Sequence, residues 1–178
     1  MNPIISAMLK FAILGTLGEV VAKLLARKRL LFTHMLYSML VWALLGAVIK
    51  FMFVGFDGFV EELTAHSYLP NGRIWIAFFK SVFINLLFGP WLVVGHRFLD
   101  NLVVQPFRIK TEGLKGALLT LLWFWIPAHT VTFSLPPDKR ITLAAVWSFV
   151  LGLILGIFAN VKFKGHTLVN EGNKGGGK

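Results

Sequence analysis

The chain has 178 residues, of which 56% are hydrophobic and only 15% charged, and its mean hydropathy is +0.72. Soluble domains carry about 45–50% apolar and about 25% charged residues, so this composition excludes an ordinary soluble globular protein. The formal net charge is +10, and the basic residues gather between long apolar runs. That pattern is typical of a multi-span membrane protein and does not favour nucleic-acid binding. The absence of cysteine excludes disulfides, thiolate metal sites and cysteine nucleophiles.

The first apolar segment runs from Pro3 to Ala26 and is interrupted by Lys10, Glu19 and Lys23. A bilayer span needs about 20 mostly apolar residues. We expect this segment to span. An amphipathic helix lying in the membrane interface is the alternative.

Apolar runs of spanning length follow it, and we predict a transmembrane helix for each of them: Leu30–Phe56, Ile74–Gly95, Gly116–Pro137 and Ile141–Val161. The fold class is therefore an all-α helical membrane bundle, with four firm spans and a fifth at the N-terminus. Between the second and third spans, Phe53–Tyr68 is predicted as either a short interfacial helix or a plain loop. The sequence PPDKR at Pro136–Arg140 predicts a sharp turn between the last two helices.

One domain, residues 1–163, is predicted to hold all of these helices. Residues 164–178 are polar and rich in glycine, with the sequence KGHTLVNEGNKGGGK. This composition favours a flexible tail.

The orientation is predicted from the lysines and arginines that flank the spans. Eleven of them lie in the RKR turn at 27–29, in the 96–115 loop and after the fifth span, which all fall on one side of the bilayer. Five lie on the other side or at the helix ends near it. We therefore expect the C-terminus to be cytoplasmic, in the inner membrane of a bacterium or in an organelle membrane if the source is eukaryotic.

Small residues at four-residue spacing mark helix faces that pack closely, because lipid offers no hydrophobic drive for helix association. The fifth span has Ser148, Gly152, Gly156 and Asn160 at this spacing, and the third has Ser81, Asn85 and Gly89. We interpret these faces as packing within the bundle. A polar seam or a contact with a second copy or another membrane protein is the alternative.

Polar groups within apolar runs are costly in hydrocarbon, so each of them is a candidate functional residue. Glu19 is the best candidate, and Lys23 one turn later is expected to neutralise it. Asn85 and His129 follow, with His129 two residues after Pro127, which frees a backbone carbonyl. We predict that Glu19, Asn85 and His129 face the interior of the bundle and that Trp125 lies beside them.

His96 and Asp100 share one helical face and could act as a histidine–carboxylate base. Because they follow the apolar run beside Arg97, we interpret them as a solvated interfacial cluster. No hydrolase, metalloprotease or nucleotide-binding motif is present, and the histidines show no metal-ligand spacing. We therefore predict no enzyme activity, no catalytic residue, no metal and no cofactor.

Three stretches resemble the Mpv-seventeen family, which also holds the peroxisomal membrane protein of twenty-two kilodaltons. They are GTLGEVVAK at 15–23, INLLFGP at 84–90 and WIPAHTVTFSLPPDKR at 125–140, with Trp147 further on. The chain departs from the family pattern at Ile84, where the family has an acid, and in WALLGAVIK at 42–50. The resemblance implies a divergent small helical membrane protein, and the channel role thought to apply to some members.

The leading functional hypothesis is a small pore-forming or solute-permeating protein, with the lipid bilayer as its surroundings. A non-transporting accessory or assembly protein, acting through the small-residue faces, is the runner-up. A lipid-modifying enzyme using His96 and Asp100 is a distant third. A continuous polar track that joins Glu19, Asn85 and His129 would favour the pore, and a lipid-sized cleft at His96 would favour the enzyme.

Overall fold

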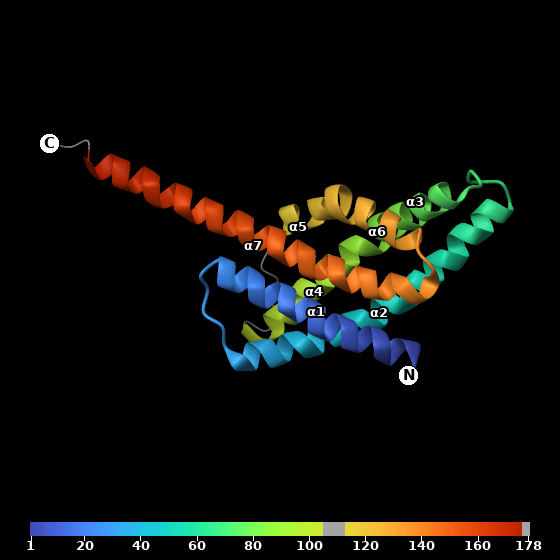
Figure 1. Ribbon diagram of the computed structural model, residues 1–178, viewed down its shortest axis with the longest axis horizontal. Helices are drawn as coiled ribbons and strands as arrows, with labels where there is room; N and C mark the ends of the chain where they lie inside the picture. The colour runs from blue at the N-terminus through green and yellow to red at the C-terminus, as the bar shows by residue number, and fades with distance from the viewer. Residues whose placement is uncertain (105–112, 176–178) are drawn as a thin grey trace.

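The computed structural model describes residues 1–104 and 113–175. Within these ranges the chain is helical and has no strand, which confirms the predicted all-α class. Figure 1 shows the helices side by side in an elongated bundle. In chain order the elements are α1 (Pro3–Leu25), α2 (Phe32–Ala65), α3 (Arg73–Phe83), η1 (Ile84–Phe88), α4 (Gly89–Val104), α5 (Leu114–Thr120), η2 (Leu121–Trp125), α6 (Ile126–Phe133) and α7 (Pro137–Gly175).

Helix α1 is long and apolar enough to cross a membrane, as expected for the first segment. The Asn2 side chain accepts a hydrogen bond from the backbone N–H of Ile4 at 2.8 Å, and Pro3 occupies the first helical turn. One face of α1 carries exposed apolar residues four apart, namely Ile5, Leu9, Ile13 and Leu17. Such a face suits lipid, whereas Ala7 and Phe11 are buried against the neighbouring helices.

Helix α2 is longer than the sequence indicates. It runs without a break to Ala65, so the prediction of a separate interfacial helix or loop over Phe53–Tyr68 is wrong. No proline interrupts this stretch, and Phe53 and Val60 are buried on the same helix. A continuous helix therefore buries these side chains while its last turns extend beyond the apolar run.

Two π-helical turns interrupt the third and fourth spans. η1 lies between α3 and α4, and η2 lies between α5 and α6. A proline follows each of them closely, Pro90 after η1 and Pro127 after η2. Proline cannot donate a backbone hydrogen bond, which loosens the preceding turn. Both segments remain long and apolar enough to span, over Arg73–Asp100 and Leu114–Phe133.

Helix α7 begins at Pro137, so the predicted turn at Pro136–Arg140 is only partly correct. The break lies just before it, around Pro136, and the DKR residues form the first turn of α7, where proline is favoured. The predicted span 141–161 lies within α7, which continues to Gly175. The polar segment 164–175 is therefore helical in the structure, and its flexibility stays a prediction.

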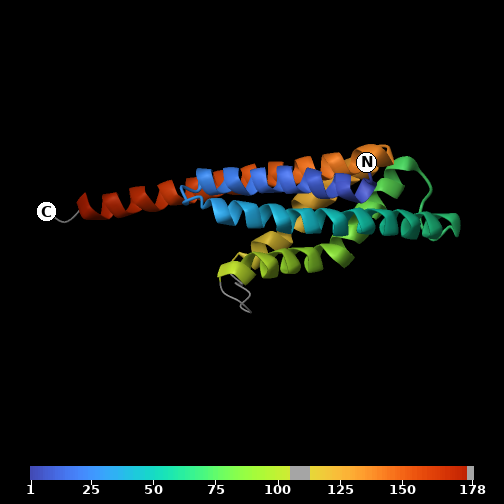
Figure 2. The same ribbon diagram turned by 90° about the horizontal axis from the view of Figure 1, so that it is seen from below.

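The chain crosses the bundle with alternating direction, as Figures 1 and 2 show. Helices α1 and α7 run in the same direction and contact each other along α1. The turn after α1 and the ends of α4 and α7 lie at one end of the bundle, which we call the basic end because its flanking segments carry most of the lysines and arginines. The α2–α3 and α6–α7 connections lie at the opposite end, called the closed end below. The chain is thus a small helical membrane protein.

Close backbone approaches hold α1 between α2 and α7. A side chain at Gly152 would lie 2.6 Å from the carbonyl oxygen of Gly18, and one at Gly46 would lie 2.8 Å from that of Ala7. Glycine is the residue that permits such approaches between membrane helices. Gly152 therefore packs within the bundle, as its spacing predicts.

Candidate functional site: a cavity that opens at the basic end

A cavity of about 750 Å³ lies inside the bundle between the α1–α2–α7 group and the helices α4 to α6. Ligand pockets in proteins typically have volumes of about 300–1,000 Å³. Glu19, Asn85 and His129 all line this one cavity, as the prediction of inward-facing polar groups requires. Its exposed lining residues include Lys28 and His34, so it opens at the basic end.

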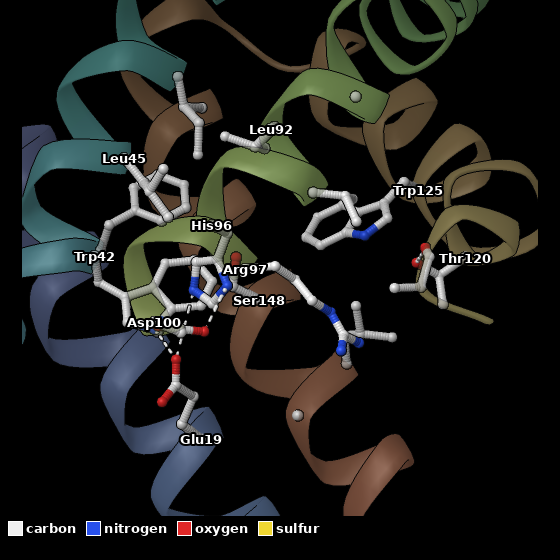
Figure 3. A pocket seen from close by; sticks show the side chains of 18 of the residues that line it. Glu19, Trp42, Leu45, Leu92, His96, Arg97, Asp100, Thr120, Trp125 and Ser148 are labelled. Carbon is white, nitrogen blue, oxygen red and sulfur yellow. Dashed lines mark hydrogen bonds and ion pairs between the residues drawn. The ribbon is translucent and has the colours of Figure 1, made fainter. Parts of the chain in front are cut away.

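At this opening, Glu19 is the centre of a polar cluster (Figure 3). Its carboxylate accepts hydrogen bonds from Ser38 Oγ and Trp42 Nε1, both at 2.8 Å. Lys23 Nζ lies 3.4 Å from Glu19 Oε2, which confirms the predicted pairing. His96 Nε2 lies 3.5 Å from Glu19 Oε1. Four neighbours from three helices therefore surround one carboxylate, which is how a buried charge is stabilised.

His96 and Asp100 belong to the same cluster. His96 Nδ1 lies 3.1 Å from Asp100 Oδ2, and the imidazole packs 4.7 Å from the Trp42 ring centre. Only 22% of the His96 side chain is exposed. The interpretation as a solvated interfacial cluster is therefore wrong for His96, because α4 turns it toward Glu19 and into the cavity, whereas the Asp100 side chain is 39% exposed.

The deep end of the cavity holds a second polar pair. Asn85 Nδ2 lies 3.1 Å from His129 Nδ1 and 2.8 Å from the Ser81 carbonyl oxygen. Since an amide nitrogen donates, His129 accepts at Nδ1 in this arrangement. The Trp125 ring lies 4.9 Å from the imidazole, which places it beside His129 as predicted. Apolar side chains, among them Leu45, line the cavity between the polar cluster at the opening and this pair. The contacts of the described residues therefore do not form the continuous polar track that would favour a pore.

Beyond the deep end, aromatic rings and ion pairs fill the bundle. The Phe53 ring packs 5.5 Å from His129 and 4.8 Å from Phe133. The Arg140 guanidinium in turn lies 5.6 Å from the Phe133 ring centre and donates two hydrogen bonds to Asp57, at 2.8 and 2.7 Å. These side chains pack between the cavity and the closed end of the bundle.

Lys80 completes this closed-end cluster. Its ammonium lies 2.7 Å from both Asp57 and Glu61, and the side chain is only 3% exposed. Helices α2, α3 and α7 are thus joined by charges. Sequence reasoning missed this cluster, because Lys80 and Arg140 looked like the flanks of separate spans.

The described packing residues of the third predicted span contact the fourth span, and those of α7 contact α1. Ser81 Oγ donates to the Ile126 carbonyl oxygen at 2.7 Å, and a side chain at Gly89 would meet Leu121 at 2.8 Å. Ser148 is buried, and its backbone carbonyl lies beside Gly18, the residue that Gly152 also approaches. The surroundings of the Gly156 and Asn160 side chains lie outside the described part of the chain.

The cluster at the opening also brings together potential metal ligands. Atoms of Glu19, His96 and Asp100 lie within 4.8 Å of one another, on helices that are far apart in the sequence. Spacing along the chain could not reveal this set. The Glu19 oxygens already accept hydrogen bonds from Ser38 and Trp42, and the cationic Lys23 lies beside them. Protein groups therefore already balance this carboxylate, and we propose no metal here.

Comparison with protein-family models, curated proteins and solved structures finds no match for this chain. The resemblance to the Mpv-seventeen family therefore stays a prediction based on its three sequence stretches.

Proposed function

We propose that the protein is a small solute-permeating membrane protein whose cavity is the solute site. The observation that carries this proposal is the single cavity that reaches from Glu19 at the basic end to Asn85 and His129 in the middle of the bundle. A cavity of this volume within membrane helices suits a bound solute, and binding sites of transporters commonly lie near the membrane midplane.

The closed end supports a conformation in which passage is blocked on one side. Asp57, Lys80 and Arg140 connect three helices there, and Phe53 and Phe133 lie between these charges and the cavity. Release on that side requires the ion pairs to separate. Pairs that break and re-form are a common basis for two-state motion in membrane proteins.

The accessory-protein alternative has less support, because Gly152 packs against Gly18 of the same chain and not against a partner. The enzyme alternative is supported by the lipid-sized cavity that His96 and Asp100 line. Ser38, a hydroxyl of the same cluster, donates to Glu19. It is oriented by a carboxylate and has no histidine base within hydrogen-bonding reach among the contacts of the described residues. We therefore retain permeation as the proposed function.

The test is flux through purified protein in liposomes and planar bilayers. Carboxyfluorescein efflux and currents in KCl would be measured for the wild type and for Glu19→Gln, with Glu62→Gln as control because Glu62 is exposed at the other end of α2. We expect permeation with the wild type and the control, and an altered rate or ion preference with Glu19→Gln.

A second variant tests the closed end. Asp57→Ala should raise the leak of both probes, because Arg140 and Lys80 then lose a shared partner. The conservative variant Asp57→Glu should leak less than Asp57→Ala, because it keeps a carboxylate for both cations. No permeation above empty liposomes by folded wild type and folded Asp57→Ala protein would overturn the proposed function.

A further inference from the structure

We propose that the deep end of the cavity binds the hydroxyl group of an uncharged, membrane-borne alcohol between Asn85 and His129. The apolar body of this ligand lies along the cavity wall toward the opening. This inference rests on the proposed function and deepens it by naming the class of solute. It follows from the hydrogen-bonding atoms of the deep pair, the apolar wall and the paired charges at the opening.

The hydrogen bonds of the deep pair fix which of its atoms donate and which accept. The Ser81 carbonyl oxygen can only accept, so the Asn85 atom 2.8 Å from it is the amide nitrogen. The same nitrogen lies 3.1 Å from His129 Nδ1, which therefore accepts and carries no proton. The ring proton is then on the other nitrogen. His129 Nε2 is thus a donor, and Asn85 Oδ1 is an acceptor.

Both of these atoms are without a protein partner. Among the contacts of the described residues, Asn85 Oδ1 accepts no hydrogen bond and His129 Nε2 donates none. Neither atom is among the described side-chain atoms that neighbours bury completely without a hydrogen bond, so both are open to the cavity that their residues line. A free donor and a free acceptor on two touching side chains suit a hydroxyl group, because a hydroxyl both accepts and donates.

The pair lies where the two π-helical turns meet. Asn85 is within η1, and His129 is one turn after η2, which packs against η1. π-helical turns are rare and frequently occur at functional sites. Trp125, the last residue of η2, lies 4.9 Å from the imidazole and supplies an aromatic wall beside the pair. The interruptions of the third and fourth spans therefore coincide with the polar end of the cavity.

Between this pair and the opening, the cavity wall is apolar. Leu45 and Leu92 line it from α2 and α4 (Figure 3), and Leu151 lines it from α7. A hydrocarbon body would cover this surface, with a gain of about 0.8 kcal/mol for each buried CH₂. Leu155 also lines the cavity, is 46% exposed and belongs to the predicted span 141–161. The cavity is thus open beside an apolar residue at membrane level, which suits a ligand that arrives from the lipid.

The charged groups at the opening favour neither sign of ligand charge. Glu19 is paired with Lys23, and His96 lies against both Glu19 and Asp100. Arg97 also has an interaction of its own. A charged headgroup would compete with these contacts, whereas an uncharged ligand leaves them intact. No charged residue of the described chain lines the deep end, where an ion would lose its hydration without an opposite charge.

The experiment compares ligands that share one sixteen-carbon chain and differ in what the head can donate or accept. Hexadecanol, methyl hexadecyl ether, hexadecanoate and hexadecyltrimethylammonium would compete with a photoreactive diazirine-bearing hexadecanol for the full-length protein in phosphatidylcholine liposomes. Crosslinked peptides would be mapped by mass spectrometry. We expect hexadecanol to compete about tenfold more strongly than the ether, which cannot donate to Asn85 Oδ1, and than the two ions. Crosslinks should fall on cavity residues such as Leu92.

Two variants test the two hydrogen-bonding atoms. His129→Phe keeps a ring and removes the Nε2 donor, and Asn85→Leu removes the Oδ1 acceptor. Each should lower the affinity for hexadecanol about tenfold, and Asn85→Leu should bring it close to the affinity for the ether. The matched controls are His66→Phe and Asn71→Leu, at exposed positions of the closed end, which should leave the affinities unchanged.

A third variant tests the wall without removing a hydrogen bond. Leu92→Trp should weaken hexadecanol and its ether alike by filling the cavity. Leu86→Trp, on an exposed face of the same span, is its control. Each variant would first be checked for native helicity and a monodisperse elution profile.

The inference would be overturned by equal competition from hexadecanol and its methyl ether, by an ion that competes as strongly as the alcohol, or by crosslinks confined to lipid-exposed residues such as Leu86. Absence of hexadecanol binding together with normal carboxyfluorescein efflux would overturn the inference alone and leave the proposed function intact. Hexadecanol binding that depends on Asn85 and His129, without flux of either probe, would support the hydroxyl site and overturn the proposed function.

Discussion

The two ends of the bundle use the same chemical groups in different ways. At the closed end, Asp57 lies between Lys80 and Arg140, and each cation contacts a carboxylate at 2.7 Å. At the basic end, Glu19 also has several partners, but its cluster borders a cavity of about 750 Å³. Short ion pairs enclosed by helices favour rigidity, whereas a polar cluster beside open volume is available to a ligand. The comparison indicates that burial and neighbouring space, more than residue type, separate a structural cluster from a candidate site.

The largest expected effect is at the closed end. Lys80→Met should lower the free energy of unfolding by about 3 kcal/mol, because it removes the two charge-assisted contacts that the buried Lys80 ammonium makes with Asp57 and Glu61. Unfolding in mixed micelles with increasing SDS would measure this change. Lys139→Met is the control at an exposed position of the same end. Equal losses for both variants would show that the closed-end cluster does not stabilise the bundle.

The next largest loss of stability is expected where α7 packs closely against α1. Gly152→Ala should destabilise the protein by about 1–3 kcal/mol, because the added methyl group would lie 2.6 Å from the Gly18 carbonyl oxygen. Gly55→Ala on α2 should be neutral or slightly stabilising, since nothing lies within 4 Å of the new group. The same SDS titration applies to both. A neutral Gly152→Ala would mean that α1 and α7 are further apart than described.

A smaller effect on stability, but a clear one on flux, is expected from Glu19→Gln. The amide oxygen can still accept from Trp42 or Ser38, so the loss of stability should be about 1 kcal/mol. The negative charge beside the cavity is lost, which should change the efflux rate. Glu62→Gln provides the comparison, since the Glu62 side chain is 73% exposed and does not line the cavity. If Glu62→Gln changed flux as much as Glu19→Gln, the effect would not be specific to the cavity.

The smallest effect is expected from Ser38→Ala, which removes one hydrogen bond to Glu19. The loss should be about 1 kcal/mol or less, because Trp42 and Lys23 remain as partners of the carboxylate. SDS unfolding of this variant alone and combined with Glu19→Gln would measure the coupling. Additive losses would indicate that the hydroxyl and the carboxylate stabilise the bundle independently.

The sequence predicted the helical segments well, because each apolar run and its charged flanks are local signals. It also placed Glu19, Asn85 and His129 inside, since polar groups in an apolar run have few other favourable positions. The extension of α2 to Ala65 was missed, because Asp57 and Glu61 suggested the end of the span. Their partner Lys80 comes from another helix and is not visible from local pattern.

The site was predicted less completely for the same reason. His96 lies 77 positions after Glu19, so only the packing of α4 against α1 and α2 could show that they meet. Ser38, Trp42 and Arg97 were not identified as site residues at all. A tryptophan and a serine on α2 carry no signal in the sequence that distinguishes them from packing residues, although Arg97 beside His96 could have been included with its neighbour.

The contact between α1 and α7 has a consequence for how the protein is made. The ammonium of Lys10 lies 2.7 Å from Thr142 Oγ1, and these residues are 132 positions apart. Synthesis proceeds at about 5–20 residues per second, so α1 exists for roughly 7 to 26 seconds before that partner is translated. During this interval α1 carries Lys10, Glu19 and Lys23 without the helix that covers it. Helix α1 is therefore made well before α7, yet it reaches its final surroundings only when α7 packs against it.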